Sequence, residues 1–204
     1  MKRSLTSIIA FATAAAASVA APIQFDLKDP KGVNNIVFLA DAPLESINGT
    51  ATGISGSVSF DPAKPEATSG TVTVAVDSMT VPNPKMQEHL VGDRWLNAAA
   101  YPKIEFKLDK LSKVKKDGKK IDAMAHGTMT IHGQSKEMQI PVSLTYLEDM
   151  LAKRHGKEEG DILVIRSDFS VKRSEFGVNS GNMEDKVADE IELRLSLAGF
   201  APDA

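Results

Sequence analysis

The chain has 204 residues, with 24 Lys and Arg against 27 Asp and Glu and no Cys, so its formal net charge is −3. This mildly acidic balance gives no long-range field that would attract nucleic acid, and we expect no nucleic-acid partner. Because Cys is absent, disulfide bonds are excluded, and packing and backbone pairing must stabilise the fold.

The first 21 residues have the pattern of a cleaved secretory signal peptide. Lys2 and Arg3 precede an apolar run over residues 8–17 that leads into small residues. Removing residues 1–21 leaves 22 Lys and Arg against 27 Asp and Glu, a net charge of −5. No later stretch approaches the ~20 apolar residues of a membrane-spanning helix. We therefore expect a periplasmic or secreted protein with no integral membrane span after cleavage and one domain over residues 22–204.

From residue 23 onward, apolar and polar residues alternate with the period of two that is typical of half-buried β-strands. In KIEFKLDKL, residues 103–111, the side chains of Ile104, Phe106 and Leu108 share one face. The same count predicts further strands at residues 71–81, 136–146 and 187–199, and near 35–40, 51–60, 121–132 and 161–171.

Short segments are expected to reverse the chain between these strands. Asp117-Gly118 is a strong hairpin signal, and Asn48-Gly49 predicts another turn. The charged segment 148–161 is long enough to hold a short helical piece. Connections of this kind favour antiparallel neighbours.

One convincing helix is predicted, over residues 82–97. Pro84 suits its first turn, and Asn97 can end it. Pro102 disfavours helical conformation in the residue before it, so a strand must begin after this point. The hydrophobic face of the helix, with the only tryptophan, Trp95, would then close one end of the fold. Whether Trp95 contacts a ligand or only plugs this end is left open.

About eight antiparallel strands, each with one apolar face, must pack as a sandwich or close into a barrel. Periodicity alone does not separate the two. Most of the strands are about ten residues long, with a single apolar side and few bulge signals. This favours an all-β fold in which the sheet closes into an antiparallel barrel with one short helix near its end.

Three motifs stand in order along the chain. They are Tyr101-Pro102-x-Ile104-x-Phe106, Thr130-Ile131-x-Gly133 followed by Lys136, and Arg173-x-x-Phe176-Gly177-Val178 before the last strand. In this order they resemble the YceI-like family of polyisoprenoid-binding proteins, and the resemblance covers essentially all of the chain after the signal. It implies an extended, lipocalin-like β-barrel whose apolar interior holds a long isoprenoid chain, in the bacterial periplasm or secreted.

The candidate ligand-binding residues are the apolar side chains that face inward on the predicted strands or helix, together with Phe176 of the third motif. They are Phe38, Ile54, Val58, Phe60, Val74, Met86, Leu90, Trp95, Ile104, Phe106, Met129, Ile140, Val142, Leu144, Phe169, Phe176, Leu193 and Leu195. These side chains could also simply fill an eight-stranded barrel, which is only just wide enough for packing or one ligand. Strand pattern alone favours packing, whereas the resemblance favours a bound lipid. Small residues such as Gly56, Ala125 and Gly127 would leave room for it.

No motif in the sequence predicts catalysis. GxSxG, HExxH and a Cys nucleophile are absent, so we expect no catalytic residue and no cofactor. His126 and His132 are six residues apart on one predicted strand, ~20 Å, which is too far to share a metal ion. Arg173, Glu175 and residues 185–190 could orient a ligand head group at the barrel mouth or form exposed ion pairs of little energetic weight. The ion pairs are favoured.

The sequence therefore predicts a non-enzymatic barrel that binds and sequesters or carries an isoprenoid or quinone-like lipid. The alternative is a non-enzymatic stress or interaction protein with a filled barrel, whose charged loops at residues 114–121 and 148–161 bind a protein partner. An enzyme acting on the lipid would need a convergent polar cluster inside the barrel, and the sequence shows none. The sequence also allows a homodimer.

Overall fold

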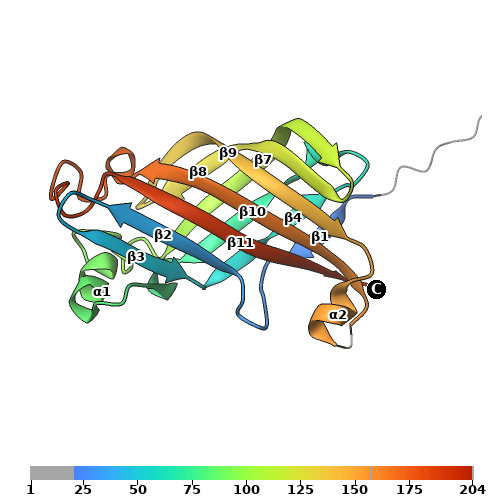
Figure 1. The fold of residues 1–204 in the computed structure, drawn as a ribbon, viewed down its shortest axis with the longest axis horizontal. Coiled ribbons are helices and arrows are strands. Elements are labelled where there is room, and N and C mark those ends of the chain that lie inside the picture. The colour runs from blue at the N-terminus through green and yellow to red at the C-terminus, as the bar shows by residue number, and fades with distance from the viewer. Residues whose placement is uncertain (1–20, 157, 204) are drawn as a thin grey trace, which may run out of the picture.

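The chain folds into a ring of eight antiparallel strands (Figure 1). The computed structural model describes residues 21–156 and 158–203, so the predicted signal peptide, apart from its last residue, lies outside the described residues. In ring order the strands are β1 (Ile23–Asp26), β4 (Ile54–Phe60), β5 (Ser69–Ala75), β7 (Lys103–Asp117), β8 (Lys120–Ile131), β9 (Gln134–Leu147), β10 (Gly160–Lys172) and β11 (Glu190–Pro202). The ring closes because β11 pairs with β10 on one side and with β1 on the other. The predicted antiparallel barrel is confirmed.

Three further strands extend the wall at one end of the ring. They are β2 (Asn35–Asp41), β3 (Ser46–Ala51) and β6 (Met79–Thr80). They continue from the first half of β11, where residues 192–196 pair with β2, whereas Phe200 in the second half pairs with Asp26 of β1. Figure 1 shows the added strands at the end of the barrel where helix α1 (Pro84–Val91) lies.

A buried asparagine bridges the wall where β11 changes partner. Asn34 is 3% exposed, and its side-chain amide donates to the carbonyls of Leu27 and Ala198, both at 2.9 Å. Its side-chain oxygen accepts the N–H of Ala198 at 2.8 Å. The side chain thus supplies the hydrogen bonds that a strand backbone would otherwise supply at this seam.

Helix α1 is shorter than predicted. The Asn83 side chain caps it by accepting two backbone N–H groups of its first turn. Gly92 then adopts an extended conformation, and its carbonyl accepts the N–H groups of Trp95 and Asn97 at 3.1 and 2.9 Å, which turns the chain back. The predicted end at Asn97 is therefore wrong, and Trp95 lies beyond the helix.

A second helix, α2 (Leu151–His155), provides the short helical piece predicted in the segment 148–161 and lies at the end of the barrel opposite α1 (Figure 1). It covers a small hydrophobic cluster on the outer face of the barrel, in which Leu151 packs with Ile162, Ala198 and Phe200. Across the described ranges, no helix is long and apolar enough to cross a membrane.

The Asn48-Gly49 pair lies within β3, and the turn predicted there is wrong. The two residues pair with Leu39 and Phe38 of β2. A Cβ atom at Gly49 would lie 2.3 Å from Cζ of the Phe38 ring. Packing of this ring against the strand therefore requires the glycine. The chain instead turns between Ala51, the last residue of β3, and Ile54, the first residue of β4. The predicted strand 51–60 is therefore divided between β3 and β4.

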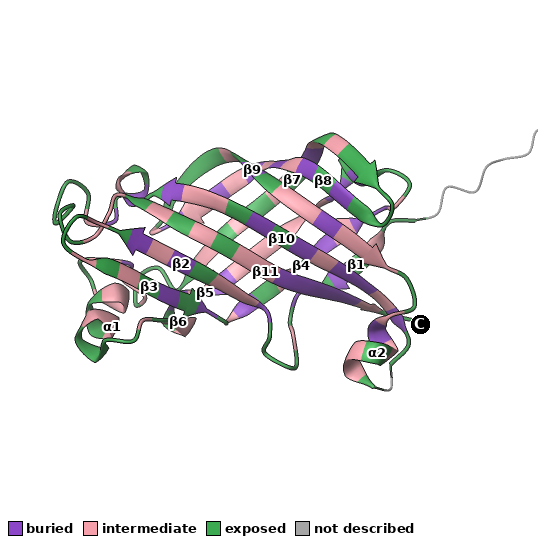
Figure 2. Cartoon of the chain, in the orientation of Figure 1, coloured by how far each residue is buried: buried purple, intermediate pink, exposed green. Residues whose placement is uncertain are grey.

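Burial follows the predicted alternation. Along β8, every second residue from Ile121 to Ile131 is buried. On β11, less exposed and more exposed residues alternate over the first half, and Figure 2 shows a continuous buried stretch further on. These inward side chains form the main hydrophobic cluster of the protein. The apolar pattern therefore identifies the inner face of the barrel correctly.

Two glycines on the inner face do not leave room in the interior as predicted. A Cβ atom would lie 2.0 Å from the Thr71 carbonyl oxygen at Gly56 and 2.1 Å from the Lys107 carbonyl oxygen at Gly127. These glycines instead allow neighbouring strands to approach closely. Ala125, by contrast, does line an interior cavity.

Replacing Gly49 by Ala should lower the free energy of unfolding by about 2–4 kcal/mol, because the methyl group overlaps the Phe38 ring and the Thr80 carbonyl oxygen. Urea unfolding followed by circular dichroism measures this. Asn48→Ala, at the exposed neighbouring position, is the matched control and should change the free energy by less than about 0.5 kcal/mol. Equal effects at the two positions would contradict the packing role of Gly49.

Candidate functional site

A cavity of ≈ 1090 Å³ occupies the half of the barrel nearer α1. Apolar side chains from the ring strands and from β2 line its wall, and residues of α1 lie at its opening. We call this cavity the chamber and its opening the mouth. Its volume is slightly above the range of about 300–1,000 Å³ for sites that bury small organic ligands.

Sixteen of the eighteen predicted binding residues line the chamber. They are Phe38, Val58, Val74, Met86, Leu90, Trp95, Ile104, Phe106, Met129, Ile140, Val142, Leu144, Phe169, Phe176, Leu193 and Leu195. The structure brings them together from nine helices and strands, from the turn after α1 and from the short 3-10 helix Arg173–Phe176 after β10. Their contact with a ligand stays a prediction.

The other two predicted residues, Ile54 and Phe60, do not line the chamber. Both are buried in the main hydrophobic cluster, and the Phe60 ring packs against Phe25 and Tyr146. Phe60 lies beyond Val58, at the filled end of the barrel, and alternation does not show at which level the interior is filled. Ile54 lies on the chamber side of Val58, opposite Val74, but is buried among neighbouring side chains. The interior is packed at the α2 end and hollow at the α1 end.

A glutamine ties α1 to the wall at the mouth. Gln87 donates from its side-chain nitrogen to the Met79 carbonyl and accepts the Val81 N–H, both at 2.9 Å. Every residue of α1 stays at least partly exposed, and its apolar residues Met86 and Leu90 face the chamber. Helix α1 therefore covers part of the mouth without being buried in the hydrophobic core.

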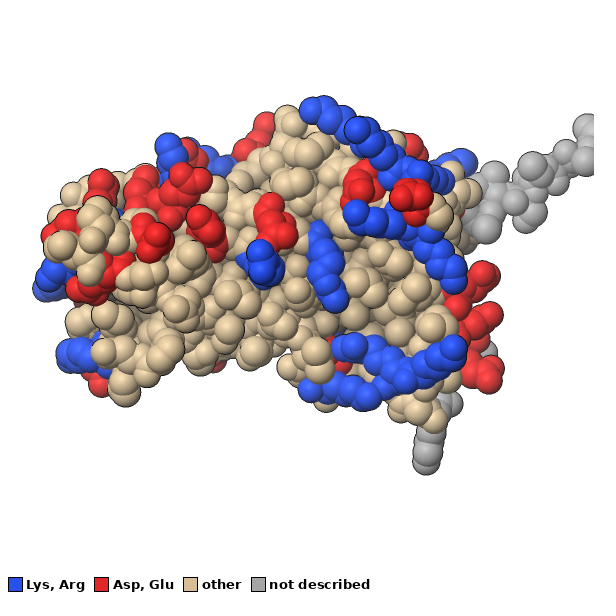
Figure 3. All heavy atoms as spheres, in the orientation of Figure 1, with Lys and Arg blue, Asp and Glu red and all other residues tan. Residues whose placement is uncertain are grey.

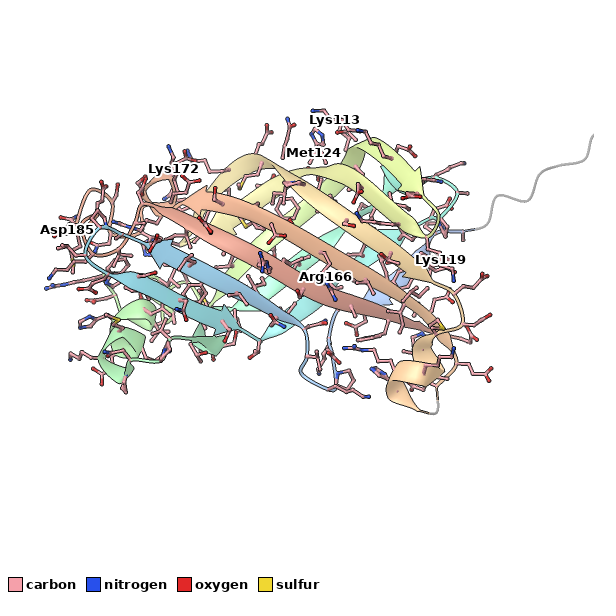
Figure 4. The ribbon with its side chains drawn as sticks, in the orientation of Figure 1. Lys113, Lys119, Met124, Arg166, Lys172 and Asp185 are labelled. Carbon is pink, nitrogen blue, oxygen red and sulfur yellow. The ribbon has the colours of Figure 1, made fainter. Side chains whose placement is uncertain are left out.

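Charged side chains gather at the mouth and leave the chamber wall apolar. Lys85 and Glu88 of α1 and Lys186 of the β10–β11 loop border the opening, so both signs of charge are present (Figure 3). Asp185 lies at the same end of the molecule, whereas Lys119 marks the opposite end (Figure 4). The barrel is thus polar at its rim and apolar within.

Arg173 is buried at the mouth, and the exposed ion pair favoured from the sequence is wrong. Only 5% of the residue is exposed, and its guanidinium lies 5.4 Å from the centre of the Trp95 ring. It donates to the carbonyls of Val178, Asn179, Asn182, Val187 and Ala188, at 2.5–3.1 Å. All five N–H donors of a guanidinium can be used in such an arrangement. Arg173 therefore shapes the loop between β10 and β11 and orients Trp95.

Asp189 stabilises the start of the same loop through hydrogen bonds to Ser174. Its carboxylate accepts the N–H and the hydroxyl of Ser174 at 2.9 and 2.8 Å. Burial opposes ionisation, but these hydrogen bonds and the charge of Arg173 outweigh it and hold the pKa of Asp189 below its ordinary value. The carboxylate therefore stays ionised near neutral pH.

The Tyr-Pro corner packs on the β8–β9 turn. Ring centres of Tyr101 and His132 are 4.5 Å apart, and the Tyr101 ring also covers Gly133. His132 has φ of +50° and belongs to this turn rather than to the strand predicted for it. This contact fixes the segment that carries Trp95 against the barrel.

Hydroxyl groups on the chamber wall are already hydrogen-bonded. Ser167 and Thr68 donate to the carbonyls of Pro141 and Pro65, each at 2.6 Å. Among residues 21–156 and 158–203, no three His, Cys, Asp or Glu side chains are grouped so that they could hold a metal ion. The chamber therefore offers a predominantly apolar surface.

A model of the YceI-like domain family matches residues 30–198. The chain belongs to the YceI-like family. The protein YceI of Escherichia coli O157:H7 is 30% identical over 154 residues, which cover 74% of this chain and 72% of that protein. The resemblance inferred from the three motifs is therefore confirmed.

Solved structures share the fold of this YceI-like barrel. The crystal structure of BcnA from Burkholderia cenocepacia matches with a TM-score of 0.65 and 23% identity, over 81% of this chain and 95% of that one. A polyisoprenoid-binding domain from Saccharophagus degradans, implicated in plant cell wall breakdown, matches with a TM-score of 0.63 and 8% identity, over 89% and 99%. The likeness lies in the fold, not in individual residues.

Replacing Arg173 by Lys should lower the free energy of unfolding by about 2–4 kcal/mol, because an ammonium group has only three donors and cannot reach all five carbonyls. The fluorescence of Trp95 should change with it, since the ring loses its cation–π partner. Arg194→Lys, in an exposed pair with Asp168, is the control and should change neither quantity. Equal stability of Arg173→Lys and the parent protein would contradict the role of Arg173 in the loop.

Proposed function

We propose that this protein is a non-enzymatic carrier or storage barrel that holds the apolar chain of an isoprenoid or quinone-like lipid in the chamber. The observation that carries the proposal is the ≈ 1090 Å³ chamber, whose wall is apolar and whose opening lies at one end of the barrel. A long apolar chain can enter such a chamber with its polar head at the charged rim.

Burial of apolar surface would drive binding, at about 0.8 kcal/mol per methylene-sized unit. Summed over several prenyl units, this would exceed the practical limit of affinity near −18 to −21 kcal/mol. Ordering of the chain must therefore offset much of the gain, and the wall should discriminate weakly among apolar chains of similar size.

The family supports a binding role rather than catalysis. One fold relative is described as a polyisoprenoid-binding domain, and the hydroxyls on the wall of the present chamber are engaged with backbone carbonyls. The hollow chamber also disfavours the alternative of a filled barrel. We place the protein in the periplasm or outside the cell, as one domain over residues 22–204, on the pattern of its first 21 residues.

Native mass spectrometry of protein purified from a bacterial host without detergent tests the proposal. We expect an added mass that corresponds to one lipid molecule and that solvent extraction removes. The stripped protein should then take up geranylgeraniol, and the emission of Trp95 should change because this residue lines the mouth. An empty protein that also fails to bind geranylgeraniol would contradict the proposal.

Neighbouring residues on β11 provide a matched pair of variants. Leu193 lines the chamber, whereas Arg194 is exposed on the outer face. Leu193→Asn should weaken geranylgeraniol binding about tenfold, because a polar group is placed against the apolar chain. Arg194→Asn should leave the affinity unchanged.

A further inference from the structure

The chamber ends at one level of the barrel, although the barrel itself continues. On β4 the chamber ends at Val58, and the next inward residue is Phe60; on β9 it ends at Leu144, and the next is Tyr146. On β10, Leu163 holds the corresponding position and is completely buried. The residues beyond the chamber thus form one layer across the barrel.

Three aromatic rings fill this layer. The ring centres of Phe25 and Phe60 are 6.4 Å apart, those of Phe25 and Tyr146 are 6.4 Å apart, and those of Phe60 and Tyr146 are 5.9 Å apart. All three pairs are edge-on or tilted, which is a favourable geometry for aromatic side chains. Phe25 and Phe60 have no exposed surface, so the layer is tightly packed.

Contacts around the rings hold them in place. The Tyr146 hydroxyl donates to Asp161 at 2.6 Å, and burial together with Asp161 raises the pKa of Tyr146, so the phenol stays protonated. Beside Phe25, a Cβ atom at Gly199 would lie 2.9 Å from the Phe25 Cβ. The glycine therefore allows Phe25 to lie close to β11.

We propose that Phe25, Phe60 and Tyr146 form a floor that sets the length of the chain the chamber accepts, an inference that rests on the proposed function. From Ile165 on β10 to Arg173, which directly follows this strand, the lined segment is about 26 Å long at ~3.3 Å per residue. With a strand tilt of ~40°, this gives a depth of about 20 Å along the barrel axis. A longer chain must fold back or leave its end outside the mouth, so affinity rises with chain length only until the floor is reached.

Changing the floor should change the preferred chain length in either direction. Phe60→Ala removes the ring next to the end of the chamber and deepens it by one inward layer, about 5 Å along the axis. Val58→Phe places a ring inside the existing space and raises the floor without removing buried surface. The second variant keeps the test valid if the first folds poorly.

The experiment measures the binding of farnesol, geranylgeraniol and solanesol to the two variants and the parent protein by calorimetry. Relative to the parent protein, Phe60→Ala should raise the affinity ratio of longer to shorter alcohols about tenfold, and Val58→Phe should lower it by a similar factor. Phe200→Ala is the control, since it removes the same side chain from the cluster under α2, and it should leave the ratio unchanged.

The outcomes separate the two proposals. If the parent protein binds the alcohols and all variants share its length profile, the floor is overturned and the proposed function stands. If the parent protein binds none of the three alcohols, the proposed function fails and the floor fails with it. Opposite shifts in Phe60→Ala and Val58→Phe, with no shift in Phe200→Ala, would establish the floor.

Discussion

The architecture depends on the way in which β11 is shared between two neighbours. Its second half closes the ring with β1, and its first half opens the wall toward β2. The hydrogen bonds of Asn34 to Leu27 and Ala198 join the two arrangements at the point where they meet. One end of the barrel is thereby narrow enough to be filled by side chains, while the other end is wide enough to hold a chamber.

The same barrel therefore contains both an interior filled by side chains and an open chamber. The aromatic layer of Phe25, Phe60 and Tyr146 supplies the solid core that a barrel of this size needs. The apolar side chains that line the chamber have no protein atoms to contact across the cavity. This loss of van der Waals contacts lowers the stability of the fold, and the packed end of the barrel must offset it. At the mouth, hydrogen bonds stabilise the loop between β10 and β11. The buried guanidinium of Arg173 donates to backbone carbonyls along this loop.

Much of this could be predicted from the sequence, because a period of two defines which side chains face inward. Alternation correctly placed residues such as Phe106, Val142 and Leu195 on the chamber wall. It could not assign Phe60 to the floor. The period of two shows which face of the sheet a residue is on, but it does not show the register between strands, which sets the height of each residue in the barrel. The role of Gly49 was missed for a related reason, since the Phe38 ring that requires it lies on another strand.

Arg173 shows a different limit of sequence reasoning. Nearby carboxylates suggested an ion pair, but its partners are backbone carbonyls, which every residue possesses and no sequence pattern marks. Backbone hydrogen bonds similarly determine where α1 ends, because the Gly92 carbonyl accepts the N–H groups of Trp95 and Asn97 and turns the chain. Side-chain patterns therefore predicted the wall of the site better than its mouth.

We propose above that one apolar chain lies in the chamber with its end against the aromatic floor. A crystal structure of the protein in complex with geranylgeraniol tests this most directly. We expect continuous ligand density from the mouth near Trp95 to the level of Val58 and Leu144, with none beyond Phe60. Density confined to the outer surface, or a chamber filled by side chains, would contradict it.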